Sequence, residues 1–186
     1  YLPFYKYGII HGDPHLGNYT VQNDHSINLF DFGCMRVFKG KFIQGVIDLY
    51  YALQKNNIAQ AVHAYEQWGF DNITKKKLEV LNKWANFLYS PLLEDKVQKI
   101  QKSDSGIFGA KIAAEVHQEL KKLGGVKPPK EFVFMDRAAV GLGSVFMHLK
   151  AEVNWYRIFH DLIEHFDEKK LNDKQQSTLK LVDLKL

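Results

Sequence analysis

Three oxygen-bearing side chains near the N-terminus have the types and the spacing of a magnesium-dependent phosphoryl-transfer site. Asp13 and Asn18 are five residues apart, and Asp31 follows Asn18 by thirteen. Such a transfer needs a carboxylate near the attacking oxygen and hard oxygen ligands on Mg²⁺. We therefore predict that Asp13 orients or deprotonates the nucleophile, and that Asn18 and Asp31 bind magnesium and, through it, ATP.

The residues around these three follow the order of a kinase catalytic loop and its magnesium motif. Residues 11–18 read HGDPHLGN, and residues 31–33 read DFG. Asp is common in turns, both directly before Pro, as at Asp13, and close before Gly, as at Asp31. Neither aspartate alone therefore supports a catalytic interpretation. The ordered set matches the kinase template in which Asp, four residues and Asn precede DFG. We predict supporting roles for His11, His15, Phe32 and Gly33.

The two histidines of the loop differ in what they are expected to do. His11 occupies the position from which a kinase histidine packs and hydrogen-bonds against the DFG backbone, so we predict a structural role. His15 completes an HxDxH pattern, which also suits a zinc site because two imidazoles and a carboxylate are common zinc ligands. A zinc hydrolase is therefore kept as an alternative, although zinc would require neither Asn18 nor DFG.

The hydrophobic pattern predicts a short β segment followed by a helical body. Residues 19–30 alternate β-forming residues around a polar turn, which indicates a hairpin that brings Asp31 back to Asn18. Apolar residues that recur every three or four positions predict packed helices at 41–53, 58–68, 74–89, 111–123, 131–150 and 152–166. A short helix and a loop are expected within 92–109. Gly141 and Gly143 are expected to permit close helix-to-helix approach.

We expect residues 1–166 to form one domain and residues 167–186 to be a charged tail or a frayed terminal helix.

Composition excludes several classes of protein. Hydrophobic residues make up 46% of the 186 residues, enough for a core of one domain. The net charge of +4 is spread along the chain, which does not favour nucleic acid as a partner. Cys34, the single cysteine, excludes an internal disulfide. No apolar run is long enough for a membrane span, and no signal peptide is recognised.

The loop and several later segments resemble the UbiB/AarF family of atypical kinases, in which the loop reads HxDPHPGN before DFG. Leu16 stands where that family usually has Pro, and the likeness recurs at residues 136–144 and 152–155. The resemblance implies a protein-kinase-like C-terminal lobe, mainly α with a small β-hairpin. It also implies an ATP-dependent, magnesium-requiring ATPase or small-molecule kinase linked to ubiquinone or isoprenoid-lipid metabolism.

The same resemblance implies that the chain needs further segments or partners. The family's KxGQ motif, phosphate-pairing Lys and Glu partner are not identified in these residues, which begin at Tyr1 as a fragment or truncated product would. We therefore expect the chain alone to be inactive, with an N-lobe segment or a partner chain required. A lipid or membrane surface on the cytoplasmic side is a further candidate partner. An aminoglycoside- or choline-type phosphotransferase and a non-catalytic scaffold remain alternatives.

Overall fold

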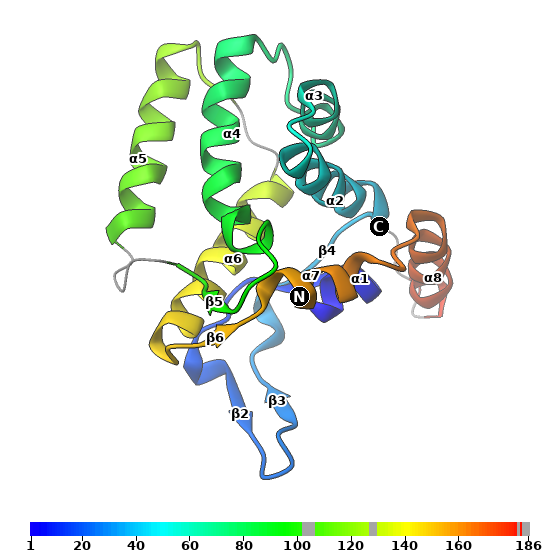
Figure 1. Ribbon diagram of the computed structural model, residues 1–186. Coiled ribbons are helices and arrows are strands. Elements are labelled where there is room, and N and C mark those ends of the chain that lie inside the picture. Colours follow the sequence, from blue (N-terminus) through cyan, green and yellow to red (C-terminus); the bar gives the residue numbers. More distant parts are fainter. Residues whose placement is uncertain (102–106, 127–129, 182, 184–186) are drawn as a thin grey trace.

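The computed structural model describes residues 1–101, 107–126, 130–181 and 183, and this part of the chain is mainly helical with small antiparallel sheets (Figure 1). The mainly α fold class with a β-hairpin is thereby confirmed. The helices are α1 (Leu2–Tyr7), α2 (Gly40–Gln54), α3 (Ile58–Gln67), α4 (Lys75–Tyr89), α5 (Ile107–Lys122), α6 (Lys130–His148), α7 (Trp155–Ile163) and α8 (Glu168–Lys180). The strands are β1 (Ile9–His11), β2 (Tyr19–Val21), β3 (Ile27–Leu29), β4 (Met35–Val37), β5 (Gln98–Lys99) and β6 (Glu152–Val153), and short 3₁₀ turns are η1 (Leu16–Asn18), η2 (Phe32–Cys34) and η3 (Ser90–Leu92).

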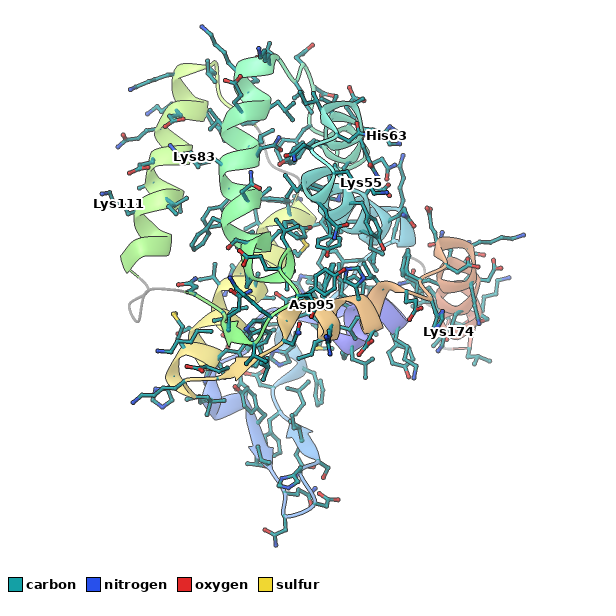
Figure 2. The ribbon with its side chains drawn as sticks, in the orientation of Figure 1. Lys55, His63, Lys83, Asp95, Lys111 and Lys174 are labelled. Atoms are coloured by element: carbon teal, nitrogen blue, oxygen red, sulfur yellow. The ribbon has the colours of Figure 1, made fainter. Side chains whose placement is uncertain are left out.

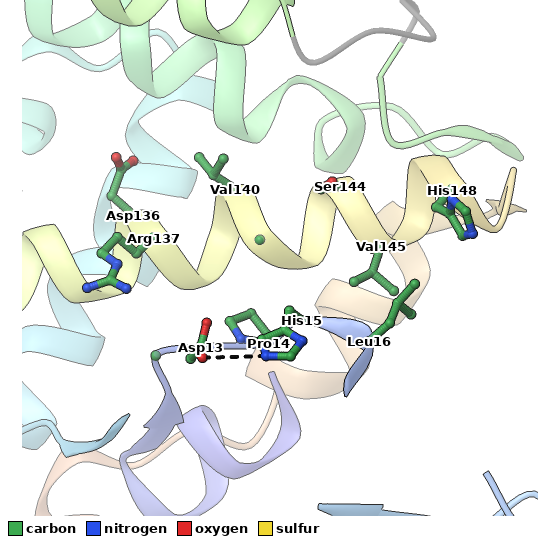
Figure 3. A pocket seen from close by; sticks show the side chains of 12 residues that line it. Asp13, Pro14, His15, Leu16, Asp136, Arg137, Val140, Ser144, Val145 and His148 are labelled. Carbon is green, nitrogen blue, oxygen red and sulfur yellow. Dashed lines mark ion pairs between the residues drawn. The ribbon is translucent and has the colours of Figure 1, made fainter. Parts of the chain in front are cut away.

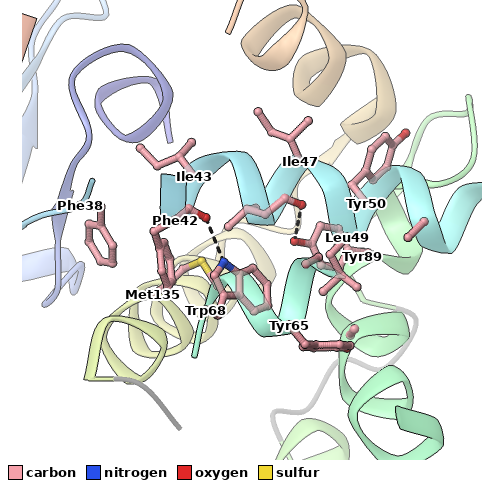
Figure 4. Packing of buried hydrophobic residues seen from close by; sticks show 14 of the residues in the cluster. Phe38, Phe42, Ile43, Ile47, Leu49, Tyr50, Tyr65, Trp68, Tyr89 and Met135 are labelled. Carbon is pink, nitrogen blue, oxygen red and sulfur yellow. Dashed lines mark hydrogen bonds between the residues drawn. The ribbon is translucent and has the colours of Figure 1, made fainter. Parts of the chain in front are cut away.

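The hydrophobic core lies between the helices, and the predicted apolar stripes share it. One buried cluster combines residues of α2, α4 and α6 with α1 and the aromatic side chains after α3. Two hydrogen bonds pin helices together inside it: Trp68 Nε1 donates to the Phe42 carbonyl at 2.9 Å, and the Tyr89 hydroxyl donates to the Val46 carbonyl at 3.0 Å (Figure 4). Each large apolar side chain that is fully buried contributes roughly 1.5–3 kcal/mol. The apolar stripes within 42–53, 78–88 and 131–149 share this core, as predicted, but the hairpin that was expected to lie above them projects away from the helical body (Figure 1).

A small sheet between β1 and β4 was not predicted. Ile9 pairs with Val37 and His11 with Met35, so the strand before the catalytic loop lies beside the strand after DFG. The chain reaches β1 through Gly8, which ends α1 in the left-handed region at φ 70°. Both ends of residues 11–35 are therefore fixed at one place, and the β2–β3 hairpin projects from there away from the helical body (Figure 1).

Three expected elements differ from the structure. No short helix forms in the described residues between η3 and residue 101; instead β5 pairs with β6. Helix α5 begins at Ile107, four residues earlier than expected, and the expected loop at 103–106 lies outside the described residues. Helix α7 begins at Trp155 because Asn154 caps it, accepting from the Arg157 N–H at 3.0 Å. Trp155 and Phe159 of this helix are buried.

Charged side chains cover the outside of the helical body (Figure 2). Lys83 of α4 forms ion pairs with Glu119 at 2.9 Å and Glu115 at 3.6 Å, both on α5. Asp95 accepts hydrogen bonds from Asn154 and Arg157, which fastens the start of α7 to the segment before β5. No helix in the described part of the chain is both long and apolar enough to cross a bilayer.

The last helix, α8, docks on the N-terminal elements through side-chain amides. Gln175 is buried, and its Nε2 donates to the carbonyls of Tyr7 at 3.1 Å and Phe38 at 2.9 Å. Asn172 Oδ1 accepts from the Gly40 N–H at 3.0 Å, so it caps α2, whose own N-cap side chain makes no such bond. Of the two alternatives expected for residues 167–186, the described residues form the terminal helix, from Glu168 to Lys180, and this helix is packed and not frayed.

Gln175→Ala is expected to destabilise the protein by about 2–3 kcal/mol, because two backbone carbonyls lose their shared donor in a buried position. Gln176→Ala is the matched control: the same change, one position along α8, at an exposed side chain. Urea unfolding followed by circular dichroism measures both. Equal stability losses in the two variants would show that the Gln175 amide does not hold α8 in place.

Candidate active site

Asp13 and Asn18 are held together in the catalytic loop that follows β1. Asn18 is 7% exposed and ends the η1 turn. Its Nδ2 donates to the Asp13 backbone carbonyl at 2.9 Å and to Asp13 Oδ2 at 3.2 Å. The amide nitrogen therefore faces Asp13. Among the described residues nothing donates to Asn18 Oδ1, the atom that magnesium would require.

His11 links the catalytic loop to DFG. Its Nδ1 accepts from the Asp13 N–H at 3.2 Å, so the proton of the neutral ring resides on Nε2. Nε2 lies 2.9 Å from the Asp31 carbonyl and 3.1 Å from the Phe30 carbonyl and donates to both. This is the hydrogen bonding to the DFG backbone that the sequence predicted for His11. One imidazole thus fixes the segment before Asp13 against the segment that carries Asp31.

The β2–β3 hairpin returns the chain to the loop. Tyr19 pairs with Leu29 and Val21 with Ile27, and the Phe30 N–H donates to the Asn18 carbonyl at 2.7 Å, closing the hairpin at its base. The predicted hairpin at 19–30 is present, with strands shorter than the expected segments 19–22 and 26–30. Its closing bond places the residue before Asp31 directly against Asn18.

Asp31 has a backbone conformation that few side chains tolerate. Its φ is 53°, in the left-handed region, where Asp and Asn are the best tolerated residues after Gly. Oδ1 accepts from the Gly33 N–H at 3.2 Å, while Oδ2 receives no hydrogen bond from the described residues. Strained residues of this kind cluster at active sites. Phe32, the middle residue of DFG, is 63% exposed beside it.

His15 is committed to the local fold of the loop. Its Nδ1 accepts from the Gly17 N–H at 2.9 Å, which caps η1, and its Nε2 lies 3.8 Å from Asp13 Oδ2. Both nitrogens of His11 are also engaged with backbone groups. The two imidazoles therefore do not offer a shared zinc site in this geometry. Within the described residues no group of three His, Cys, Asp or Glu side chains is placed to hold a metal.

Helix α6 forms the opposite wall of the site. A cleft of about 600 Å³ separates it from the catalytic loop, with Asp13 on one side and Arg137 on the other (Figure 3).

The expectation that Gly141 and Gly143 allow two helices to approach is wrong. A Cβ on Gly141 would lie 2.9 Å from Cγ of Pro14 in the loop, and one on Gly143 would meet no heavy atom within 4 Å among the described residues. Gly141 therefore admits the catalytic loop.

Sequence analysis did not assign the α6 residues to the site. One face of α6 lines the cleft, and its residues are spaced three or four positions apart: 137, 141, 145 and 148. That periodicity was read only as a packed helix face. Asp136 points away from the loop, and its carboxylate accepts from Trp84 Nε1 at 3.0 Å (Figure 3). Burial raises the pKa of Asp136, and the Trp84 hydrogen bond partly opposes that rise.

Arg36 of β4, three residues after the DFG glycine, packs against α6. Its guanidinium lies 4.5 Å from the centre of the Phe134 ring, and Nη1 donates to the Met35 carbonyl at 2.8 Å. A cation above an aromatic ring at this distance is attracted to the ring's negative face. Arg36 therefore fastens β4 to α6.

The loop that holds Asp13, the hairpin and the DFG turn follow one another in the order of a kinase-like site. Comparison with known families agrees: residues 3–65 match the ABC1 atypical kinase-like domain. The matched segment runs from α1 into α3 and includes each of the predicted site residues. It is consistent with a member of the UbiB/AarF type, the family that the sequence resembles. No curated protein matches the chain.

Proposed function

We propose that this chain is the C-terminal catalytic lobe of a UbiB/AarF-like atypical kinase or ATPase that uses Mg-ATP. The observation that carries the proposal is the orientation of the Asn18 amide. Its nitrogen is held by Asp13, which leaves Oδ1 open, and Asp31 Oδ2 is open as well. An amide oxygen and a carboxylate oxygen suit magnesium, which is normally held by few protein ligands together with substrate phosphates.

In this proposal the chain's residues divide the work of transfer. Asn18 and Asp31 would hold magnesium, which would supply neutralisation of the charge on the phosphates. The attacking hydroxyl or water gives its proton to Asp13 as its oxygen bonds to the γ-phosphorus, and the bond from that phosphorus to the β,γ-bridging oxygen breaks to release ADP. His11 keeps Asp13 and Asp31 in fixed relation and takes no part in the proton transfer.

The exposed apolar side chains around the hairpin suggest where a partner segment docks. Leu16, Ile27, Phe30 and Phe32 are 48%, 66%, 47% and 63% exposed, respectively. Large apolar side chains exposed next to a functional site commonly mark an interface. We propose that a preceding segment or a partner chain covers this face and supplies the lysine and glutamate that hold the ATP phosphates. A lipid surface and a link to ubiquinone or isoprenoid lipids are proposed from the resemblance alone.

A second candidate is a phosphotransferase for small molecules of the aminoglycoside or choline type. The cleft between Asp13 and α6 favours it, because about 600 Å³ is within the range of small-molecule sites. The two candidates share the roles of Asp13, Asn18 and Asp31 and differ in the acceptor of the phosphoryl group.

Asp31→Asn is expected to weaken Mg-ATP binding by about 10- to 100-fold, more than Asp13→Asn does, because Asp31 holds the ion whereas Asp13 acts chiefly when the nucleophile attacks. Titration calorimetry on the chain fused to the N-terminal lobe of a UbiB/AarF relative measures both. Asp24→Asn, the same change at the exposed hairpin turn, is the control. Equal losses for the two site variants would contradict the division of roles, and Mg-ATP binding unaffected by Asp31→Asn would overturn the proposed function.

A further inference from the structure

The cleft between the catalytic loop and α6 has the lining of a binding site for an organic molecule with a charged end. Apolar walls come from Pro14 and Leu16 of the loop and Val140 and Val145 of α6. Its permanent cation is Arg137, whose guanidinium points from α6 toward the loop near Asp13, while His148 lies at the other end (Figure 3). Apolar walls with a few charged groups that fix orientation are typical of small-molecule sites.

Arg137 has no anionic partner in the described part of the chain. No carboxylate of the described residues lies within 4 Å of its guanidinium, although Asp136 is adjacent in sequence and Asp13 lies across the cleft. Asp136 is turned to Trp84, and Asp13 is held by Asn18. The other exposed arginine beside α6, Arg36, is stacked on Phe134. A planar guanidinium offers several fixed donors that match carboxylate and phosphate oxygens.

A cation at this position also answers an electrostatic problem of the site. A molecule that approaches Asp13 with a phosphate or carboxylate of its own is repelled by the Asp13 carboxylate, because like charges repel strongly at short range near a protein surface. Arg137 on the facing wall offsets that repulsion. It makes the cleft selective for molecules that bring an anionic group.

We propose that this cleft is the acceptor site, and that Arg137 binds the anionic group of a small organic acceptor whose apolar body lies between the loop and α6. The acceptor role rests on the proposed function, whereas anion binding by Arg137 does not. Phosphate and carboxylate share the chemistry that Arg137 recognises. The acceptor hydroxyl would lie toward Asp13, which receives its proton.

The test uses the 186-residue chain and three probes: phenyl phosphate, benzoate and inorganic phosphate. Two-dimensional amide NMR titrations are expected to show saturable shifts confined to residues 12–16 and 137–148. Phenyl phosphate should bind more tightly than inorganic phosphate, because its ring adds apolar burial. Comparing phenyl phosphate with benzoate decides whether the site favours a phosphate or a carboxylate.

Arg137→Gln is expected to weaken phenyl phosphate binding about tenfold or more, and Arg137→Lys to recover part of that loss. Arg36→Gln, which removes an arginine outside the cleft, is the matched control and should bind as the unaltered chain does. Shifts centred elsewhere, the absence of saturable binding below about 10 mM, or equal binding by the Arg137→Gln and Arg36→Gln variants would each overturn the proposal.

Failure of anion binding at Arg137 and failure of the proposed function can be told apart. Asp31→Asn should leave phenyl phosphate binding unchanged, because that residue lies outside the cleft lining. If the probe binds through Arg137 while the fused protein fails to bind Mg-ATP, the proposed function falls and the anion site stands. If Mg-ATP binds and the probe does not, the acceptor assignment is wrong and the nucleotide site stands.

Discussion

Gly8→Ala is expected to destabilise the protein by roughly 3–5 kcal/mol. Gly8 has a φ of 70°, and a Cβ there would lie 2.6 Å from the Phe38 carbonyl oxygen and closer still to Nε2 of Gln175. The carbonyl belongs to the backbone beside β4 and cannot move without disturbing the β1–β4 pairing. The substitution therefore strains the residue that joins α1 to β1 and also displaces the amide that docks α8.

Gly69→Ala is the control for backbone strain alone. Gly69 has a φ of 88°, and a Cβ on it would meet no heavy atom within 4 Å among the described residues. We expect it to cost about 1–2 kcal/mol, the usual penalty of the left-handed region. Chemical denaturation of the two variants gives the difference directly, because both changes restrict the unfolded chain equally. Similar losses at Gly8 and Gly69 would mean that the packing around Gly8 adds nothing.

Gly141→Ala is expected to lower the ATP turnover of the fused protein about 100-fold with little change in KM for ATP. A methyl group at this position would lie 2.9 Å from Pro14 Cγ, and a proline ring has few ways to move aside. Displacement of Pro14 shifts the adjacent Asp13. A misplacement of about 1 Å can cost that much in rate when catalysis depends on positioning. Gly141 is thus a positioning residue that acts through Pro14.

Gly143→Ala separates this effect from helix stability. Both changes replace a helical glycine of α6 and should raise helix propensity by about 1 kcal/mol. Gly143 faces no atom that a methyl group would displace, so its variant should retain turnover within about twofold. Amide NMR of residues 13–18 gives a second measurement, in which shifts are expected for Gly141→Ala alone. Unchanged loop resonances together with unchanged turnover in both variants would refute the positioning role.

The sequence by itself determined the elements that depend on short-range pattern. Helices α2, α3, α4 and α6 lie within a few residues of their predicted ranges, because apolar spacings of three and four report a buried helix face locally. The hairpin was predictable for the same reason: β-forming residues flank a polar turn at 23–25. The order of Asp13, Asn18 and Asp31, with the hairpin between, was enough to predict that the chain returns Asp31 to the loop.

Contacts between distant residues were decided only by the tertiary structure. Strands β1 and β4 have three residues each, too few to show a period, and their pairing depends on the loop and hairpin between them. The polar composition of α8 left a charged tail and a terminal helix both open, and the choice depends on Gln175 and Asn172, whose backbone partners are more than a hundred residues away.

The same reason explains why α6 was not predicted to border the site. Its glycines mark a close approach, and composition alone does not say which segment approaches. Pro14 fills that place for Gly141, while Gly143 has no such neighbour among the described residues. Sequence analysis assigned no role to Arg137 by itself, and only the fold sets it across a cleft from Asp13. Local periodicity reports that a residue faces a partner, and only the packed chain determines which partner that is.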